Sequence, residues 1–227
     1  MRSVTYLIIN SLIFLPVLIL SFRTDVKPHR HPVALLIAYL LVSVPFIIWD
    51  IWATGSGHWS FNSNYILGPE LMGVPLEEWL FFITVPFAMI YTWGVVKIYI
   101  SDKPAPLAWP FLGFGIIGGL SIWMLLNNWS NGYTRSAAIA ALITVCIGLF
   151  IGLSFTVRFW TFQIILLSLF LIFNSVLTSL PIIIYGVDAI IGLRVGTIPV
   201  EDLFFGFALV NLFLYVFNIV DQRRLPR

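Results

Sequence analysis

Charged residues are scarce in this chain. Only 10% of its 227 residues are Asp, Glu, Lys or Arg, while 60% are hydrophobic. A soluble domain usually carries about 25% charged residues to cover its surface, so the composition excludes an ordinary soluble protein. The formal net charge is only +2. Such a small excess does not support a nucleic-acid partner, because nucleic-acid binding requires a concentrated basic surface.

Cysteine and histidine are also rare. The single cysteine, Cys146, lies in an apolar run and excludes an intramolecular disulfide. Of the three histidines, His29 and His31 flank Arg30 in a basic loop, and His58 is predicted on the opposite side of the membrane. A structural or catalytic zinc site needs at least three protein ligands close together. The sequence therefore predicts no metal site.

Long apolar runs are what the sequence has instead. A helix needs ~20 apolar residues to cross the hydrocarbon core of a bilayer. We therefore predict an all-α, multi-pass membrane protein with about seven transmembrane helices. The first run lacks the small-residue cleavage site of a signal peptide, so we expect it to be retained as a span. The predicted spans are 4–22, 33–52, 75–100, 107–126, 136–157, 161–184 and 199–219.

The basic residues predict the orientation of these spans, because cytoplasmic loops are enriched in Lys and Arg. We therefore predict a protein of the cell membrane whose basic-rich side faces the cytoplasm, with the N-terminus outside and the C-terminus inside. The residues on that side are Arg23, Lys27, Arg30, Lys97, Lys103, Arg158, Arg223, Arg224 and Arg227. Those on the other side are Arg2, Arg135 and Arg194.

Two segments of the chain repeat each other. Residues 66–81 match residues 190–205 with a constant offset of 124. Each segment carries glycine, proline, two adjacent acids and aromatic residues in the same order. The matching pairs include Gly68 and Gly192, Pro75 and Pro199, Glu77 and Glu201, Glu78 and Asp202, and Phe81 and Phe205.

The repeat predicts the domain organisation. Carried upstream, the same offset pairs Asp50 with Asn174. We predict a first three-span repeat at 1–100, a linking span at 101–135 and a second three-span repeat at 136–227. Because one span separates the repeats, both have the same orientation and are related by an axis along the membrane normal.

The paired acids are the main candidates for catalysis. Glu77, Glu78, Glu201 and Asp202 are predicted in the first turn of spans three and seven, just after a proline. Acids at that position complement the helix dipole, which is a purely structural role. However, ionisable groups at membrane depth are costly and are usually functional. Two adjacent acids, duplicated in register, therefore indicate catalytic residues.

Aromatic residues accompany the acids. Acids and aromatic rings in a dry site suit carbocation chemistry. A protonated carboxyl can donate a proton to an alkene, aromatic faces stabilise the cation, and a carboxylate removes a proton. The sequence leaves open which carboxyl holds the proton. The predicted substrate-binding residues are Asp50, Asn174, Trp79, Phe81, Phe82, Phe204 and Phe205.

The duplicated motif resembles a known family. Pro75-Leu76-Glu77-Glu78 and Pro199-Val200-Glu201-Asp202, each followed by aromatic residues, are similar to the heterodimeric-type lycopene cyclases, in the form where two three-span subunits are fused. The resemblance implies a lycopene β-cyclase that is cofactor-free and non-redox, an isomerase of carotenoid biosynthesis. It would convert the ψ-end groups of lycopene to β-ionone rings, giving γ-carotene and then β-carotene. It also implies catalytic roles for the motif acids and makes other carotenoid-pathway enzymes candidate partners.

Two other functions stay open on the sequence. A small-solute transporter can also be built from three-plus-one-plus-three parallel repeats, but it would place its polar residues near mid-membrane. A membrane prenyltransferase would need aspartate-rich metal motifs for a diphosphate, and the sequence has none. The length of the carotenoid, C40 or C50, and the type of ring are also left open.

Overall fold

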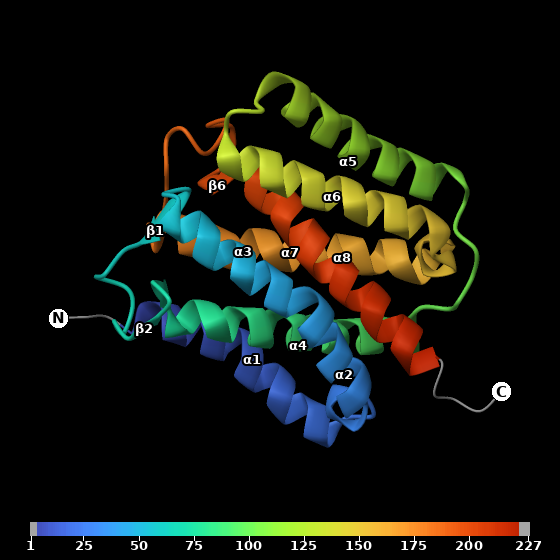
Figure 1. Ribbon diagram of the computed structural model, residues 1–227. Helices are drawn as coiled ribbons and strands as arrows, with labels where there is room; N and C mark the ends of the chain where they lie inside the picture. Colours follow the sequence, from blue (N-terminus) through green and yellow to red (C-terminus); the bar gives the residue numbers. More distant parts are fainter. Residues whose placement is uncertain (1–3, 223–227) are drawn as a thin grey trace. The chain divides into compact units, whose positions relative to one another are not determined.

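The computed structural model describes residues 4–222, and helices make up most of it (Figure 1). Among these described residues, seven helical spans are long and apolar enough to cross a membrane, which confirms the predicted fold class. The second span contains a π-helical segment, Tyr39–Ser43, between two α-helices. The spans are α1 (Thr5–Arg23), α2 to α3 (Pro32–Ala38 and Val44–Gly55), α4 (Leu76–Tyr99), α5 (Ala108–Asn127), α6 (Gly132–Phe150), α7 (Val157–Ser179) and α8 (Val200–Gln222).

Short strands lie in the loops before α4 and α8. In each loop a three-residue strand comes first. An antiparallel hairpin of two two-residue strands follows and leads directly into the helix. The same order of elements occurs once before α5 and once after it: two helical spans, a strand, a hairpin and a third helical span. The strands are β1 (Trp59–Phe61), β2 (Glu70–Leu71), β3 (Val74–Pro75), β4 (Ile183–Tyr185), β5 (Arg194–Val195) and β6 (Ile198–Pro199).

The chain forms two compact units. Unit 1 takes its described residues from Met1–Gly55, Phe61–Val95 and Leu209–Arg227, and unit 2 from Ser56–Ser60 and Val96–Ala208. Helix α8 therefore begins in unit 2 and ends in unit 1. The repeat boundaries proposed from the sequence stay a prediction.

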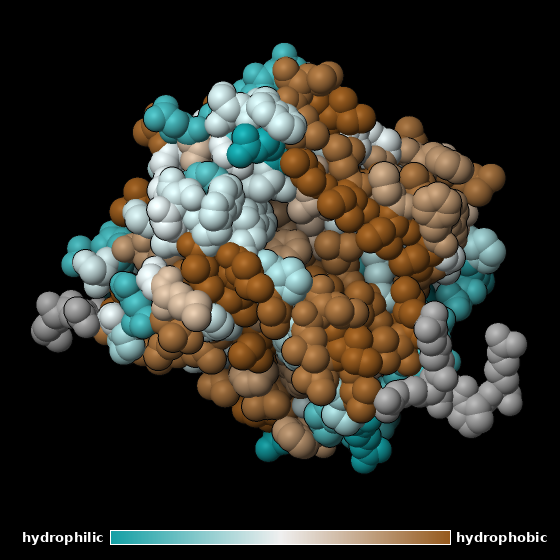
Figure 2. Space-filling model, in the orientation of Figure 1, coloured by the Kyte–Doolittle hydropathy of each residue, from teal (hydrophilic) through white to brown (hydrophobic). Residues whose placement is uncertain are grey.

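Hydrophobic side chains cover much of the surface shown in Figure 2. Large apolar residues on several spans are strongly exposed, among them Leu126 at 80% and Phe150 at 92%. Exposing apolar surface to water costs roughly 25 cal/mol per Å². Contact between the same surface and apolar lipid tails does not carry this cost. The exposed faces therefore fit a chain that lies in a bilayer.

In unit 1, polar side chains of the second span compensate for a proline in α4. Pro86 has no N–H, so the Phe82 carbonyl loses the donor that a helix would supply. The Ser43 hydroxyl donates to that carbonyl at 3.0 Å, and the Tyr39 hydroxyl donates to the neighbouring Ile83 carbonyl at 2.8 Å. Unsatisfied backbone groups are costly in lipid. These bonds therefore hold the first turns of α4, which carry Glu77 and Glu78, against the second span.

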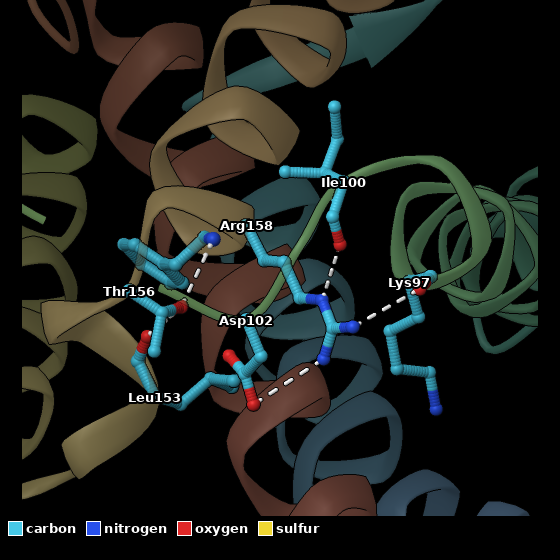
Figure 3. Close-up of polar contacts among 7 residues, drawn as sticks. Lys97, Ile100, Asp102, Leu153, Thr156 and Arg158 are labelled. Atoms are coloured by element: carbon cyan, nitrogen blue, oxygen red, sulfur yellow. Dashed lines mark hydrogen bonds and ion pairs between the residues drawn. The ribbon is translucent and has the colours of Figure 1, made fainter. Parts of the chain in front are cut away.

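In unit 2, Arg158 closes the end of α4 (Figure 3). Its Nε donates to the Ile100 carbonyl at 2.6 Å, and its Nη2 donates to the Lys97 carbonyl at 3.2 Å. These are carbonyls at a helix C-terminus, where no intrahelical donor remains. Nη1 also lies 3.3 Å from Asp102 Oδ2. Arg158 thus ties the start of α7 to the segment that follows α4.

Replacing Arg158 by methionine is expected to lower the free energy of unfolding by about 1–3 kcal/mol, since two backbone acceptors lose a charged donor. Asp102→Asn is the matched control. Asp102 is 61% exposed on its side chain, and exposed ion pairs contribute only about 0–1 kcal/mol. Unfolding in increasing SDS, followed by helical circular dichroism, measures both variants. Equal losses would show that Arg158 acts through the ion pair instead.

Candidate active site

The two acid pairs lie in the first turn of α4 and α8, as the sequence predicts. A hairpin precedes each helix, with Glu70 paired to Pro75 in unit 1 and Arg194 paired to Pro199 in unit 2. The prolines are the last strand residues, one position earlier than the first helical position predicted. Tight turns close both hairpins because glycine accepts a positive φ there: Gly73 at 78° and Gly196 at 64°.

In unit 1, Glu77 is fully buried and only one of its two oxygens has a partner. Oε1 accepts the Leu67 N–H at 2.6 Å. Within residues 4–222, Oε2 has no hydrogen-bond partner. Gly68 follows Leu67 with a φ of 98°, a conformation that favours glycine and turns the chain toward α4.

Glu78 faces helix α1. The Tyr6 hydroxyl donates to Glu78 Oε2, and both residues are buried. One helical turn further along α1, Asn10 Nδ2 donates to the Glu77 carbonyl at 3.0 Å. Thr84 in turn donates to Asn10 Oδ1 at 3.0 Å. These bonds fix the first turns of α4 against α1 within unit 1.

In unit 2, Glu201 repeats the arrangement of Glu77. Its Oε1 accepts the Ile191 N–H at 2.7 Å and the Thr134 hydroxyl at 2.6 Å. Its Oε2 is buried and has no hydrogen-bond partner in the described part of the chain. Ile191 and Leu67 are separated by the repeat offset of 124. Both repeats therefore present one buried carboxyl oxygen without a donor.

Asp202 has a fuller set of partners than any other acid in unit 2. The Tyr133 hydroxyl donates to Oδ1 at 2.7 Å. The Tyr185 hydroxyl and Asn174 Nδ2 donate to Oδ2 at 2.6 and 2.8 Å. The carboxyl is 6% exposed, so these three donors replace water around it. Asn174, predicted from the repeat, is therefore in direct contact with a motif acid.

The tyrosine and threonine partners are residues that the sequence analysis missed. Tyr6 and Tyr133 both lie near the start of the first span of their repeat and both bind the second motif acid. Their separation is 127, not 124, because the first spans are displaced by three residues relative to the loops. The repeat offset of 124 therefore does not pair these two tyrosines. The partners missed are Tyr6, Tyr133, Tyr185, Thr134 and Asn10.

Of the remaining predicted binding residues, Asp50 lies on α3, whereas the tryptophan and the phenylalanines lie on the same helices as the acids. Asp50 is 2% exposed near the end of the second span, and its Oδ1 lies 3.5 Å from the Thr54 hydroxyl. Trp79 Nε1 donates to the Leu71 carbonyl at 3.3 Å, which ties it to the hairpin. Their roles in substrate binding stay predictions, as do those of four phenylalanines. These are Phe81 and Phe82, in edge contact at 5.5 Å, and Phe204 and Phe205, both half-buried.

Aromatic rings surround the tyrosines of unit 2. The Tyr133 and Tyr185 rings stack with centroids 6.0 Å apart and planes within 9°. Trp59 meets Tyr133 edge-on at 4.8 Å, and Phe205 meets it at 6.4 Å. Arg194 lies over the Tyr185 ring at 5.7 Å. These contacts fix the two hydroxyl groups that point at Asp202.

The start of α6 is held against two loops, the one that carries His58 and the one that carries Ala189. The His58 ring packs directly against Gly132, where any side chain would overlap it. The N–H groups of Tyr133 and Thr134 donate to the Ala189 carbonyl at 3.0 and 3.2 Å. Burial, and then the positive charge of Arg135, lower the pKa of His58 below its usual value, so the ring is neutral at neutral pH. A neutral ring tolerates this packed position.

Within residues 4–222, no three His, Cys, Asp or Glu side chains converge as a metal site would require. The described residues form a multi-pass membrane fold with two equivalent pairs of buried acids. The family model described as lycopene cyclase matches it over residues 3–96 and 133–220, which together cover more than half of the sequence. The chain therefore belongs to the lycopene cyclase family.

The match confirms the resemblance found in the motifs. Its two segments contain both acid pairs and leave out α5, the helix between the repeats. Membership supports lycopene cyclisation, a carotenoid substrate and a role in carotenoid biosynthesis, and it does not favour a transporter or a prenyltransferase. No curated protein and no solved structure matches the chain.

Proposed function

We propose that this protein is a cofactor-independent lycopene β-cyclase, which converts the ψ-end groups of lycopene to β-ionone rings and so yields γ-carotene and then β-carotene. One observation carries the proposal. Each repeat buries a glutamate, Glu77 or Glu201, with one oxygen anchored by a backbone N–H and the other without a partner. A buried polar atom is normally hydrogen-bonded. Two equivalent buried oxygen atoms without a partner support the proposal that the substrate reacts beside them.

The reaction needs only proton transfer. A carboxylic acid adds a proton to the terminal double bond of the ψ-end, and the π electrons of that bond form the new C–H bond. The resulting tertiary cation is attacked by a second double bond of the same chain, which forms the C–C bond of the ring. A carboxylate then removes a ring proton, and the C–H electrons form the ring double bond. One proton enters and one leaves, so the product is an isomer and no electron acceptor is required.

The surroundings of the acids suit a cationic intermediate. Aromatic faces stabilise desolvated cations by ~2 kcal/mol or more, and Phe82 and Phe205 lie within one or two helical turns of the motif acids. Buried carboxyls supply and remove protons without bulk water, which would otherwise trap the cation as an alcohol. The motif acids are therefore proposed as catalytic, and Asp50, Asn174 and the neighbouring aromatic residues as substrate-binding.

The proposed location is a cell membrane, with the N-terminus outside. The described loops between α1 and α2 and between α4 and α5 carry Lys27 and Lys103, and Arg158 begins α7. All three belong to the basic-rich side, which the positive-inside rule places in the cytoplasm. The residues of the C-terminal arginine cluster lie outside the described range.

Expression in cells that accumulate red lycopene is expected to turn them yellow-orange. Chromatography of extracted pigments should show γ-carotene and β-carotene, because each substrate molecule has two ψ-ends. Washed membranes should convert added lycopene without flavin or nicotinamide, since the proposed reaction transfers no electrons. Unchanged lycopene, with the protein present in the membrane, would contradict the proposed function. A requirement for flavin would contradict its cofactor independence alone.

A further inference from the structure

We infer that the two acids of each pair have different roles. The first acid carries the proton on its unpartnered oxygen, and the second is held as a carboxylate by tyrosine hydroxyl groups. This inference rests on the proposed function and assigns the proton within it. It also adds tyrosines to the site as positioning residues, because they act through the second acid. The tyrosines are Tyr6 in unit 1 and Tyr133 and Tyr185 in unit 2.

The first acid accepts hydrogen bonds at one oxygen only, as a neutral carboxyl group does. An ionised carboxylate accepts at both oxygens, whereas a protonated one accepts at its carbonyl oxygen and donates from the other. In Glu201, both donors, Ile191 N–H and the Thr134 hydroxyl, bind Oε1. Oε2 is buried and receives none among residues 4–222. A proton on Oε2 avoids an unsolvated charge and stands ready for an alkene.

Glu77 repeats this pattern with a shorter list of donors. Leu67 N–H binds Oε1 at 2.6 Å, and Oε2 is again buried without a partner within the described range. The loop glycines, Gly68 and Gly192, both adopt positive φ and shape the same backbone donor. Since the two repeats differ at many other positions, the shared one-sided bonding of the first acid is a property of the site.

The second acid has the hydrogen bonds of a carboxylate. Three groups donate to Asp202, one to Oδ1 and two to Oδ2, at 2.6–2.8 Å. Hydrogen bonds to an ionised group are shorter and stronger than neutral ones, and together they reduce the cost of its burial. Such a group can attract the cationic intermediate and accept its proton. The two tyrosine rings, stacked at 6.0 Å, keep both hydroxyl groups aimed at it.

The proton balance closes within one pair. The first acid gives a proton to the alkene and becomes a carboxylate. The second acid takes a proton from the cyclised cation and becomes neutral. The pair as a whole holds one proton before and after the reaction, and Asp202 must give its proton back to Glu201 before the next turnover. The net change is isomerisation of the substrate alone.

The repeats differ around the second acid. The position of Tyr185 is occupied in repeat 1 by Phe61, which has no hydroxyl group, and that of Asn174 by Asp50. Glu78 nevertheless receives the Tyr6 hydroxyl, the counterpart of Tyr133. The carboxylate role therefore has its strongest support in unit 2, where the test is best made.

The first test compares the stability of Glu201→Gln and Asp202→Asn in the full-length protein in lipid nanodiscs. Glutamine imitates a neutral glutamic acid, so Glu201→Gln is expected to unfold at the same SDS concentration as the wild type. Asparagine places an NH₂ group against donors, so Asp202→Asn is expected to unfold at a lower SDS concentration. The reverse order would overturn the inference. This result does not depend on cyclase activity.

The second test measures the protonation state directly by infrared spectroscopy of the resting protein. The difference between wild type and Glu201→Gln should contain the carbonyl stretch of a protonated carboxylic acid. The difference between wild type and Asp202→Asn should contain carboxylate bands instead. A protonated band that disappears with Asp202 would overturn the assignment. If Asp202→Asn does not fold, the double variant Tyr133→Phe, Tyr185→Phe replaces it and should shift the same carboxylate bands.

The tyrosine variants test positioning. Each of Tyr133→Phe and Tyr185→Phe is expected to slow cyclisation about tenfold, the effect of losing one hydrogen bond to a charged group. Tyr91→Phe is the matched control, because its buried hydroxyl lies 3.3 Å from the Thr24 hydroxyl and the control should leave both rate and bands unchanged. Normal rates in both site variants would overturn the positioning role. Absence of cyclisation in the wild type would contradict the proposed function. The infrared spectra would still test the protonation states of the two acids, because they are recorded without turnover.

Discussion

Replacing Glu77 or Glu201 by glutamine is expected to lower the rate of lycopene cyclisation by about 10²–10⁴-fold, the usual effect of losing a general acid or base. Glutamine has the volume of glutamate, and its carbonyl oxygen can still accept the N–H of Leu67 or Ile191. Its amide nitrogen takes the place of Oε2 but does not deliver a proton to an alkene. The rate should therefore fall while the fold is kept.

The measurement is the ratio of cyclised pigment to lycopene in washed membranes, at equal protein abundance. Ser121→Ala serves as the control, because Ser121 is a buried polar residue of helix α5 and donates to the Ile117 carbonyl of its own helix. It should keep normal activity. Near-normal rates in both glutamine variants would place the acid elsewhere, and Asp50, 2% exposed on the second span, would become the next candidate.

The number and type of the spans could be predicted from the sequence, because hydropathy reports lipid contact directly. Helix ends were less well predicted where apolar residues continue through a turn. The run 136–157 contains both the end of α6 at Phe150 and the short 3-10 helix Gly152–Phe155. Composition does not reveal that the chain reverses there. Thr156 did carry a signal, since its hydroxyl caps α7 by accepting the Phe159 N–H at 3.3 Å.

The start of α6 shows a second limit of hydropathy. We predicted that the span begins at residue 136, after Arg135, whereas the helix begins at Gly132. Arg135 lies in the first turn and satisfies its charge locally: its guanidinium lies 5.4 Å from the Trp129 ring and donates to the Trp129 carbonyl at 3.2 Å. The four added residues include Tyr133 and Thr134, the partners of the second acid pair. Because Arg135 was assigned to the loop, the predicted span left out two residues of the site.

The acids themselves could be found in the sequence because both pairs follow a proline in register. Their partners could not, since hydrogen bonds between spans join residues far apart in the chain. Tyr6 and Glu78 are 72 positions apart, and Thr134 and Glu201 are 67 apart. Nothing in local periodicity links such residues. The one-sided bonding of Glu77 and Glu201, which carries the proposed function, depends on atomic contacts and is invisible to sequence patterns.

Cysteines placed in the loops at Ser63 and Val187 are expected to react fully with a membrane-impermeant thiol reagent on intact cells. A cysteine at Gln222 should react only after the cells are opened. The charge distribution predicts that both loops lie outside, because an even number of predicted spans separates them and the basic residues are expected on the other side. Val187 is 88% exposed, and Ser63 and Gln222 are exposed as well. The background is Cys146→Ala, because Cys146 is itself exposed on α6.

This labelling pattern tests a requirement of the chemistry. Each loop leads through its hairpin into an acid pair, so loops on one side mean that both pairs lie near the same membrane surface. A carotenoid long enough to reach across a bilayer would then present its two ψ-ends to that surface in turn, which explains γ-carotene as an intermediate. Labelling of one loop but not the other would contradict the parallel repeats. Protection of both loops, with labelling at Gln222, would reverse the orientation and still leave both acid pairs on one side.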